Sequence, residues 1–431
     1  MAEHPLKSII KENKQNRSTG ICSICSANEY VIEAALDKAN EKNSVVLIEA
    51  TANQVNQFGG YTGMRPADFI KFVYEIADRI SFPKDRIILG GDHLGPLTWK
   101  NEAAASAMEK AVDLVSEYVL AGFTKIHLDT SMKLGDDSPD TMLETRIIAE
   151  RSATLAAAAE KAYAQLLETK PESVRPVYVI GSEVPIPGGS QDENEGICVT
   201  KACDFEETVS VFSRAYADAG LEDAWKNVIA CVVQPGVEFG DHTIHEYNTE
   251  AAAELTGALA NYADMAFEGH STDYQTSKAL HEMLRDGVAI LKVGPALTFG
   301  LREGLFSLNM IENELYYGTQ DFKPSQFIEV LEKVMLEKPE NWVKHYHGDE
   351  LKLRLARKYS LSDRCRYYLA DPRVKASIAL LLDNLSKTEI PLTLLNQYMP
   401  VQYRKIREGR LKNDPVALLK DKIGDVIEDY I

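Results

Sequence analysis

The chain has 431 residues, of which 45% are hydrophobic and 26% are charged, and its formal net charge is −18. A chain of this length can bury a sizeable core, either as one large domain with an appendage or as two domains. The acidic excess argues against nucleic acid and anionic membranes as partners, because both would repel such a surface.

The sequence predicts a cytoplasmic protein. No stretch approaches the roughly 18 consecutive apolar residues of a membrane span, and the polar N-terminus lacks the apolar core of an export signal. Six cysteines in a chain of this size fit a reducing compartment. Cys22 and Cys25 have the CxxC spacing of redox and zinc sites, but they lie in the apolar run GICSICSA, which favours a buried strand.

Eight short apolar runs recur along the chain and predict strands. They cover residues 20–26, 44–51, 86–93, 124–131, 177–185, 228–236, 265–272 and 289–297. Between them lie segments with apolar residues at intervals of three and four, such as 28–42, 65–80 and 103–123, which predict helices. Near-continuous Val, Ile and Leu strands that alternate with helices indicate a parallel sheet covered on both faces. Eight such units predict an α/β fold, a (β/α)₈ barrel over residues 1–319.

Beyond residue 320 the pattern becomes helical throughout. Residues 325–346, 363–370, 373–385 and 414–431 have helical periodicity, with Pro and Gly between them. Because no low-complexity linker separates this part from the barrel, residues 320–431 are expected to form a helical extension packed on it.

Polar side chains gather at the predicted strand ends. A barrel places the C-terminal ends of its strands on one face, where the chemistry of this fold occurs. These ends carry Glu49, Asp92, His93, Asp129, Glu183, Gln234, His270 and Lys292. Imidazole and carboxylate groups are ligands of divalent metals. The sequence therefore predicts a metal site in which His93 and His270 converge across the mouth, with Glu183, Glu238 and His242 as candidates for further ligands.

The roles of the individual side chains stay open at this point. Asp92 should point differently from His93 along an extended chain, which leaves its carboxylate free as a general acid or base. An Asp at a strand end also often caps the following helix, and a single His as readily hydrogen-bonds a backbone carbonyl. Glu49, Asp129 and Gln234 are expected to orient neighbouring groups. His127 should point away from Asp129 or lie within its strand, which favours a core role.

Two glycine-bearing turns are candidates for holding phosphate. EGHSTDYQ and KVGPALTFGLREG follow the seventh and eighth strands, where barrels commonly build a phosphate cup from backbone N–H groups. The side chains that would assist, with the glycine of the second turn, are Ser271, Thr272, Lys292, Gly294 and Arg302. NQFGGYTGMRP, residues 56–66, has neither a Walker A nor a Rossmann fingerprint, and is expected to be a mobile active-site loop with Arg65 as an anion contact.

Ten segments spread along the chain are long enough to be specific: GICSICSA, IEATANQVNQFGGYTGM, RIILGGDHLGP, KIHLDTSM, GSEVPIPGG, VVQPGVEF, STDYQT, ILKVGPALTF, YSLSDRCRYY and IPLTLLNQYMP. Through them the chain resembles the non-catalytic (Z) subunit of class II tagatose-1,6-bisphosphate aldolase over essentially its whole length, including the extension. Members of this family have often carried the label of tagatose-6-phosphate kinase, which the lack of any nucleotide-binding motif here does not support.

The resemblance implies a class II aldolase-like barrel that acts in galactitol, tagatose or N-acetylgalactosamine breakdown beside a catalytic (Y) subunit. Some relatives are described instead as metal-dependent 4-epimerases of fructose 6-phosphate and tagatose 6-phosphate. GGDH resembles the strand-three motif of the catalytic subunits, which makes Asp92 the proton carrier and His93 a metal ligand. EGHST likewise makes His270 a ligand, and Glu183 matches a strand-five carboxylate with a metal-binding or catalytic role. Where catalytic subunits carry a metal-binding His after strand six, this chain has Val237, so the third ligand is open between Glu238 and His242.

Two functions follow as alternatives. In the first, a divalent metal, Zn²⁺ or else Mn²⁺, Ni²⁺ or Co²⁺, binds the O2/O3 side of a phosphorylated ketohexose, and Asp92 takes the C4 hydroxyl proton. The C3–C4 bond would then break and release an aldehyde. If the aldehyde rotates and adds again, the result is epimerisation at C4; if the aldehyde leaves the site, the result is aldol cleavage. In the second, the barrel is a silent partner that stabilises a catalytic subunit. We favour the first, because buried acids and imidazoles clustered without purpose are costly. A homo-oligomer is also expected.

Overall fold

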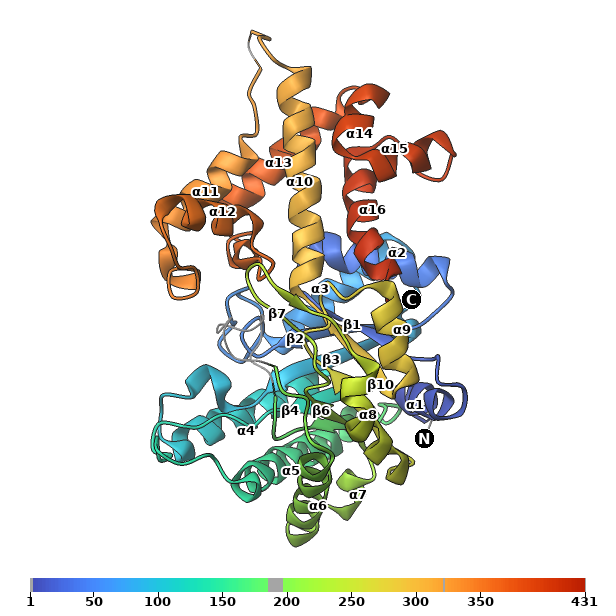
Figure 1. Ribbon diagram of the computed structural model, residues 1–431, viewed down its shortest axis with the longest axis vertical. Helices are drawn as coiled ribbons and strands as arrows, with labels where there is room; N and C mark the ends of the chain where they lie inside the picture. Colours follow the sequence, from blue (N-terminus) through green and yellow to red (C-terminus); the bar gives the residue numbers. More distant parts are fainter. Residues whose placement is uncertain (1–2, 185–196, 321, 431) are drawn as a thin grey trace.

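The eight predicted strands form a closed parallel barrel (Figure 1). The structure is a computed structural model that describes residues 3–184, 197–320 and 322–430. Around the barrel the strand order is β1, β10, β9, β6, β5, β4, β3, β2. The strands are β1 (Ile21–Cys25), β2 (Val46–Thr51), β3 (Ile87–Leu94), β4 (Lys125–Leu128), β5 (Val177–Ile180), β6 (Val228–Val233), β9 (Ala266–Gly269) and β10 (Val288–Val293). The prediction of a (β/α)₈ barrel is confirmed.

Helices follow the strands and cover the outside of the barrel (Figure 1). Along the strands nearly every side chain is buried, because one face of the sheet packs on helices and the other fills the barrel. The helices of this part are α1 (Pro5–Asn16), α2 (Glu29–Glu41), α3 (Pro66–Arg79), α4 (Ala104–Ala121), α5 (Thr145–Thr169), α6 (Ala202–Asp218), α7 (Glu222–Trp225), α8 (Thr249–Ala258), α9 (Ser277–Arg285) and α10 (Pro295–Leu315). A small hairpin of β7 (Glu238–Phe239) and β8 (Ile244–His245) follows β6. No helix in the described part of the chain is long and apolar enough to cross a membrane.

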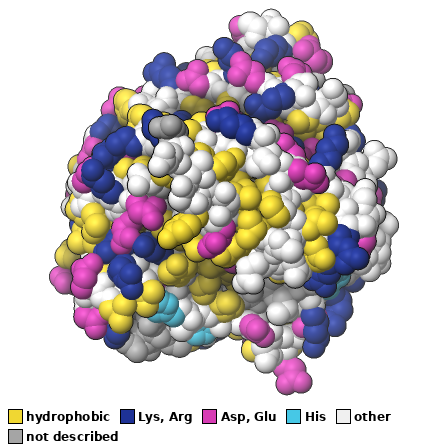
Figure 2. All heavy atoms as spheres, turned by 90° about the horizontal axis from the view of Figure 1, so that it is seen from above, with side chains coloured by type: hydrophobic (Ala, Val, Ile, Leu, Met, Phe, Trp, Pro, Cys, Tyr) yellow, Lys and Arg dark blue, Asp and Glu magenta, His cyan; other side chains and the backbone are white. Residues whose placement is uncertain are grey.

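The C-terminal helices pack on α10, the last barrel helix, and on α2. They are α11 (Phe327–Glu337), α12 (Glu350–Tyr359), α13 (Pro372–Ser386), α14 (Leu392–Tyr398), α15 (Pro400–Arg407) and α16 (Pro415–Glu428). In Figure 1, α10 runs upward from the barrel between α11–α13 on one side and α14–α16 on the other. Figure 2 looks onto the molecule from this end and shows hydrophobic side chains gathered near the middle of the face, with charged side chains around them.

The first helix closes the N-terminal end of the barrel. Leu6 and Ile10 of α1 are buried in a cluster with barrel residues, and α1 packs against β6 and β10. The helix begins at a histidine cap, because Nδ1 of the buried His4 accepts a hydrogen bond of 3.1 Å from the backbone N–H of Leu6. This cap requires a neutral imidazole, since a protonated Nδ1 cannot accept.

Acid should therefore loosen α1. Burial is the main cause that lowers the pKa of His4 from 6.5 to about 4. As the pH falls from 6.5 towards about 4, His4 becomes protonated in the unfolded chain but stays neutral in the folded chain. The free energy of unfolding therefore falls by up to about 3 kcal/mol. Guanidinium unfolding at pH 7 and at pH 4.5 measures the drop. His4→Asn, which caps without titrating, should show a smaller drop, and an equal drop would contradict this role.

Candidate functional site

The end of β3 has a backbone conformation that turns two adjacent side chains toward the same place. His93 has φ of +48°, in the left-handed region, and the pairing of β3 with β4 shifts register between Gly91 and Leu94. Such a bulge re-aims side chains next to sites. The expectation that Asp92 and His93 point differently is wrong for this reason, since His93 Nε2 lies 3.8 Å from Asp92 Oδ2.

Glycines on either side of this turn make room for the site. A Cβ on Gly90 would lie 2.3 Å from Oε1 of Glu49, so the missing side chain lets that carboxylate lie across β3. A Cβ on Gly95 would lie 1.7 Å from the carbonyl oxygen of Asp129. The glycines of the GGDHLG segment are therefore required by close approach of neighbouring groups.

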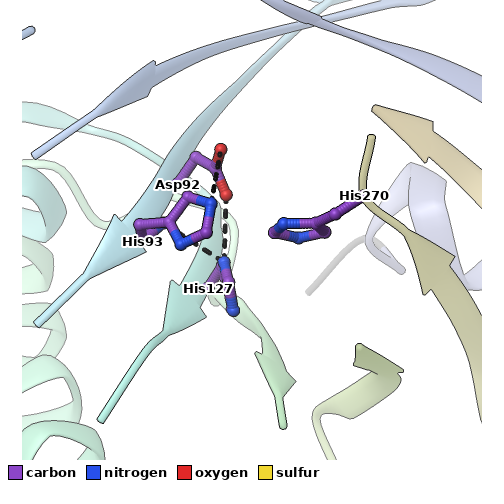
Figure 3. Close-up of side chains that lie close together, drawn as sticks. All are labelled: Asp92, His93, His127 and His270. Carbon is purple, nitrogen blue, oxygen red and sulfur yellow. Dashed lines mark hydrogen bonds and ion pairs between the residues drawn. The ribbon is translucent and has the colours of Figure 1, made fainter. Parts of the chain in front are cut away.

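Three histidines and an aspartate meet at the barrel mouth (Figure 3). The ring centroids of His93, His127 and His270 lie 4.8 to 5.1 Å apart. Nδ1 of His127 is 2.9 Å from Oδ1 of Asp92, and Nδ1 of His93 is 2.8 Å from Oδ2 of Asp129. All of these side chains are buried. The structure thus brings His93 and His270 together, as expected from the sequence.

His127 lies within β4 and is fully buried, as expected, but it also belongs to the cluster at the mouth, which the sequence did not indicate. Lys125, His127 and Asp129 occupy alternate positions, which share a face along β4 and the residue that follows it. All three side chains point toward the mouth, where Asp129 orients His93. Charged and imidazole groups inside a strand that is otherwise apolar were the available sequence signal.

A buried ion-pair network surrounds the cluster. Nζ of Lys125 lies 2.7 Å from both Glu49 and Glu268, and Nζ of Lys292 contacts Glu49 and lies 2.6 Å from Oδ1 of Asp92. With Asp129, four buried carboxylates face two ammonium groups, which leaves a formal charge of −2 if the imidazoles are neutral. Buried charge of this kind is unfavourable without a counter-ion. A divalent cation would balance it.

The electrostatics of the three imidazoles also suit a cation. Burial lowers the pKa of His270 to about 3, so its ring is neutral near pH 7. Burial opposes a charge on His93 as well, but the carboxylates of Asp92 and Asp129 outweigh it and raise the pKa of His93. Burial also works against the Asp92 carboxylate, yet His93 and Lys292 hold the pKa of Asp92 well below its usual range. An environment that favours positive charge on His93 favours a bound cation too.

The donor set fits a divalent transition metal. Ligand atoms of Asp92, His93, His127 and His270 all lie within 4.8 Å of one another, and imidazole nitrogens with a carboxylate oxygen are a common set for Zn²⁺ and similar ions. The nitrogen of His127 that faces Asp92 is Nδ1, which also accepts a hydrogen bond of 3.2 Å from the backbone N–H of His93. Nε2 of His127 is buried and has no hydrogen-bond partner within the described ranges 3–184, 197–320 and 322–430.

The cluster opens into a cavity of about 640 Å³. Asp92, His93, His270 and Lys292 line it from the barrel, and side chains of the extension line it from the other side. Cys25 also lines the cavity, and its Sγ lies 3.9 Å from Oδ2 of Asp92. This cysteine belongs to a strand, as expected, but the strand ends at the site. A cavity of this size suits a small molecule.

Four other predicted residues lie apart from the cluster. Glu183 is exposed, and its carboxylate accepts a hydrogen bond of 2.6 Å from Thr200. Glu238 is buried in β7 and accepts from the N–H of Phe239, whereas His242 is exposed in the turn after β7. Gln234 accepts from the N–H groups of Gly236 and Val237, and so orders the turn after β6. The hairpin after β6 contributes Phe239 to the cavity wall, but Glu238 and His242 do not line the cavity, and the third imidazole of the cluster is that of His127 from β4.

Of the residues predicted to contact phosphate, some line the cavity and others do not. Ser271, Lys292 and Gly294 line the cavity. Thr272 is buried and donates to the carbonyl of Lys292, and Nε of the buried Arg302 lies 2.7 Å from Asp363 of the extension, so neither reaches the cavity. Arg65 is exposed at the start of α3 and donates to the carbonyl of Gln57. The glycine-rich segment before it does contribute Tyr61 and Thr62 to the cavity wall.

Comparisons with known proteins find similar proteins over nearly the whole length of the chain. The model of a family described as D-tagatose-1,6-bisphosphate aldolase subunit GatZ/KbaZ-like matches residues 6–431. D-tagatose-1,6-bisphosphate aldolase subunit GatZ from Salmonella agona is 48% identical over 426 residues, which cover 99% of this chain and 98% of that protein, and the same protein from Salmonella typhimurium gives the same values. A crystal structure described as that of a probable tagatose 6 phosphate kinase from Sinorhizobium meliloti 1021 superimposes with a TM-score of 0.86 at 45% identity, over 95% of this chain and 99% of that one.

Proposed function

The chain belongs to the D-tagatose-1,6-bisphosphate aldolase subunit GatZ/KbaZ-like family, and from this we propose that it is a subunit of such an aldolase that stabilises a separate catalytic subunit. The relatives that match 99% of the chain carry the word subunit in their names. The proposal requires a surface on which the partner docks.

An exposed apolar stripe on α12 carries this proposal. Leu351, Leu355 and Tyr359 are 57%, 42% and 53% exposed and follow one another at intervals of four, so they share one face of the helix. Leu336 of α11, which packs against α12, is 50% exposed. Apolar side chains gathered in this way on a charged helix indicate a protein interface. We assign this stripe, Leu351, Leu355 and Tyr359, to the catalytic aldolase subunit.

Charging the stripe should weaken the complex. In Leu351→Glu/Leu355→Glu, burying two carboxylates against the partner is expected to reduce affinity for a tagatose-1,6-bisphosphate aldolase catalytic subunit by at least about tenfold. Sedimentation measures the affinity, and the half-life of cleavage activity measures the stabilisation. Leu120→Glu is the matched control, because Leu120 is 40% exposed on the barrel helix α4. Unchanged affinity, or loss of self-association only, would refute the assignment.

The assembled barrel mouth favours a second candidate function, an activity of this chain alone. In this proposal the cavity binds a phosphorylated ketohexose, and the chain interconverts fructose 6-phosphate and tagatose 6-phosphate at C4. His93, His127 and His270, with Asp92 beside them, are the residues that would hold a divalent cation, Zn²⁺ by ligand type. When bound, the cation supplies Lewis-acid polarisation of the sugar's carbonyl and hydroxyl oxygens.

Asp92 is the proton acceptor in this candidate function. Its carboxylate is ionised and lines the cavity, so it can take the proton of the C4 hydroxyl as the C3–C4 bond breaks. Lys292, whose ammonium lies 2.6 Å from Asp92, offsets the carboxylate charge and keeps its position. Re-addition of the aldehyde after rotation returns the proton and inverts C4. Identification of tagatose 6-phosphate after incubation of the purified chain with fructose 6-phosphate tests this activity.

A further inference from the structure

The turn expected to cradle a phosphate is already filled by a carboxylate. Oδ1 of Asp273 accepts hydrogen bonds of 2.9 and 2.8 Å from the backbone N–H groups of Gly294 and Ala296, at the start of α10. Asp273 is 3% exposed and lines the cavity. An anion brought to this turn would lose these donors and face a buried acidic group, which disfavours a phosphate beside the histidine cluster.

Cationic side chains line the same cavity from the extension. Arg366 belongs to the short 3₁₀ helix η5 (Arg364–Tyr367), and Lys375 belongs to α13. Nη2 of Arg366 donates to the phenolic oxygen of Tyr367 at 3.1 Å, and Nη1 donates to the backbone carbonyls of Ser362 and Asp363. These contacts hold the guanidinium in place without neutralising it.

Neither cation forms an ion pair with a carboxylate within the residues that the structure describes. Lys292 and Arg302, which the sequence suggested for this role, are both paired, with Asp92 and Asp363. Burial raises the pKa of Tyr367, but Arg366 and Arg364 outweigh it and bring that pKa below its ordinary value. Arg366 and Lys375 thus place positive charge on the extension side of the cavity, whereas Asp92 and Asp273 place carboxylates on its barrel side.

The cavity wall between the two ends is polar and aromatic. Tyr61 packs edge-on against Tyr367, with ring centroids 5.0 Å apart, and Asn53 and Thr62 lie along the same wall. Such a wall can donate to and accept from sugar hydroxyl groups. A polyol held along it would have one end at the histidine cluster and the other at Arg366.

On the premise of the ketohexose phosphate site proposed above, we propose that Arg366 and Lys375 bind the phosphate at the far end of a ketohexose monophosphate, and that Asp273 excludes a second phosphate from the carbonyl end. The specificity of the barrel mouth is then for a 6-phosphate with a free C1 hydroxyl. In this arrangement the helical extension completes the substrate site of the barrel.

Binding of hexitol phosphates to the purified full-length chain tests this proposal without turnover, because glucitol 6-phosphate and glucitol 1,6-bisphosphate lack the carbonyl needed for cleavage. Calorimetry should show tighter binding of the monophosphate to the unaltered protein. Arg366→Gln should weaken it by about tenfold or more, and Lys375→Gln by about threefold. The affinity of Arg366→Lys for the monophosphate should lie between those of the unaltered protein and Arg366→Gln. Arg354→Gln is the control, because Arg354 is exposed on α12, and it should bind as the unaltered protein does. Asp273→Asn keeps an acceptor for the two N–H groups and should raise affinity for the bisphosphate relative to the monophosphate by about tenfold.

The outcomes separate the two proposals. If the unaltered chain binds neither hexitol phosphate, the ketohexose phosphate site itself is wrong. If it binds the monophosphate and Arg366→Gln and Lys375→Gln bind equally well, the site stands and this assignment of its phosphate is overturned. Preferred binding of the bisphosphate by the unaltered chain would overturn the role of Asp273. Circular dichroism and the metal content of each variant show that a loss of affinity is not a loss of fold.

Discussion

Asp92→Asn is expected to lower any C4 epimerase activity of the purified chain by about 10³-fold, because the amide cannot accept the hydroxyl proton. The amide has nearly the shape of the carboxylate, and Lys292 keeps its contact with Glu49. The three imidazoles are unchanged, so the variant should still bind a divalent ion. The measurement is the rate of tagatose 6-phosphate formation from fructose 6-phosphate, with metal content determined on the same sample.

The control for this experiment is Asp113→Asn, which changes an exposed aspartate on α4 and should leave the rate unaltered. Full activity in Asp92→Asn would remove Asp92 from the mechanism. If the unaltered chain, loaded with Zn²⁺, has no activity, the epimerase candidate is rejected and the subunit role stands alone. The stabilisation of an added catalytic subunit would be the remaining readout.

His93→Ala should abolish metal binding, since it removes one of three buried imidazoles and leaves the Asp129 carboxylate without its partner. We expect about one divalent ion per unaltered chain and less than about a tenth of that in the variant. Mass spectrometry of the metal content after dialysis against Zn²⁺ gives the comparison. Zn²⁺ should also raise the melting temperature of the unaltered chain but not that of the variant, because only a bound ligand stabilises the fold.

His281→Ala is the matched control, because His281 is exposed on α9 and hydrogen-bonds within its own helix. It should keep the full metal content. Retention of the ion by His93→Ala would place the metal outside the histidine cluster. Loss of the ion from both variants would point to a general effect on folding.

The sequence alone predicted the barrel and part of its mouth. Strand and helix periods are local properties, and strand ends of a barrel always share one face, so Asp92, His93 and His270 could be brought together before any coordinates were known. The resemblance of long segments to one family also gave the class of function, which the comparisons support.

Only the tertiary structure determined which side chains meet. The bulge and positive φ at His93 align two adjacent residues, and a conformation of this kind leaves no periodic signal in the sequence. His127 joins the cluster through the register of β4 with its neighbours, whereas Glu183, bonded to Thr200, and His242, exposed after β7, lie outside it. The contribution of Arg366 depends on contacts between segments far apart in the chain, since the packing of the extension on the barrel brings it into the cavity. Local patterns fix elements and strand ends, but the partners of a charged side chain are fixed by long-range packing.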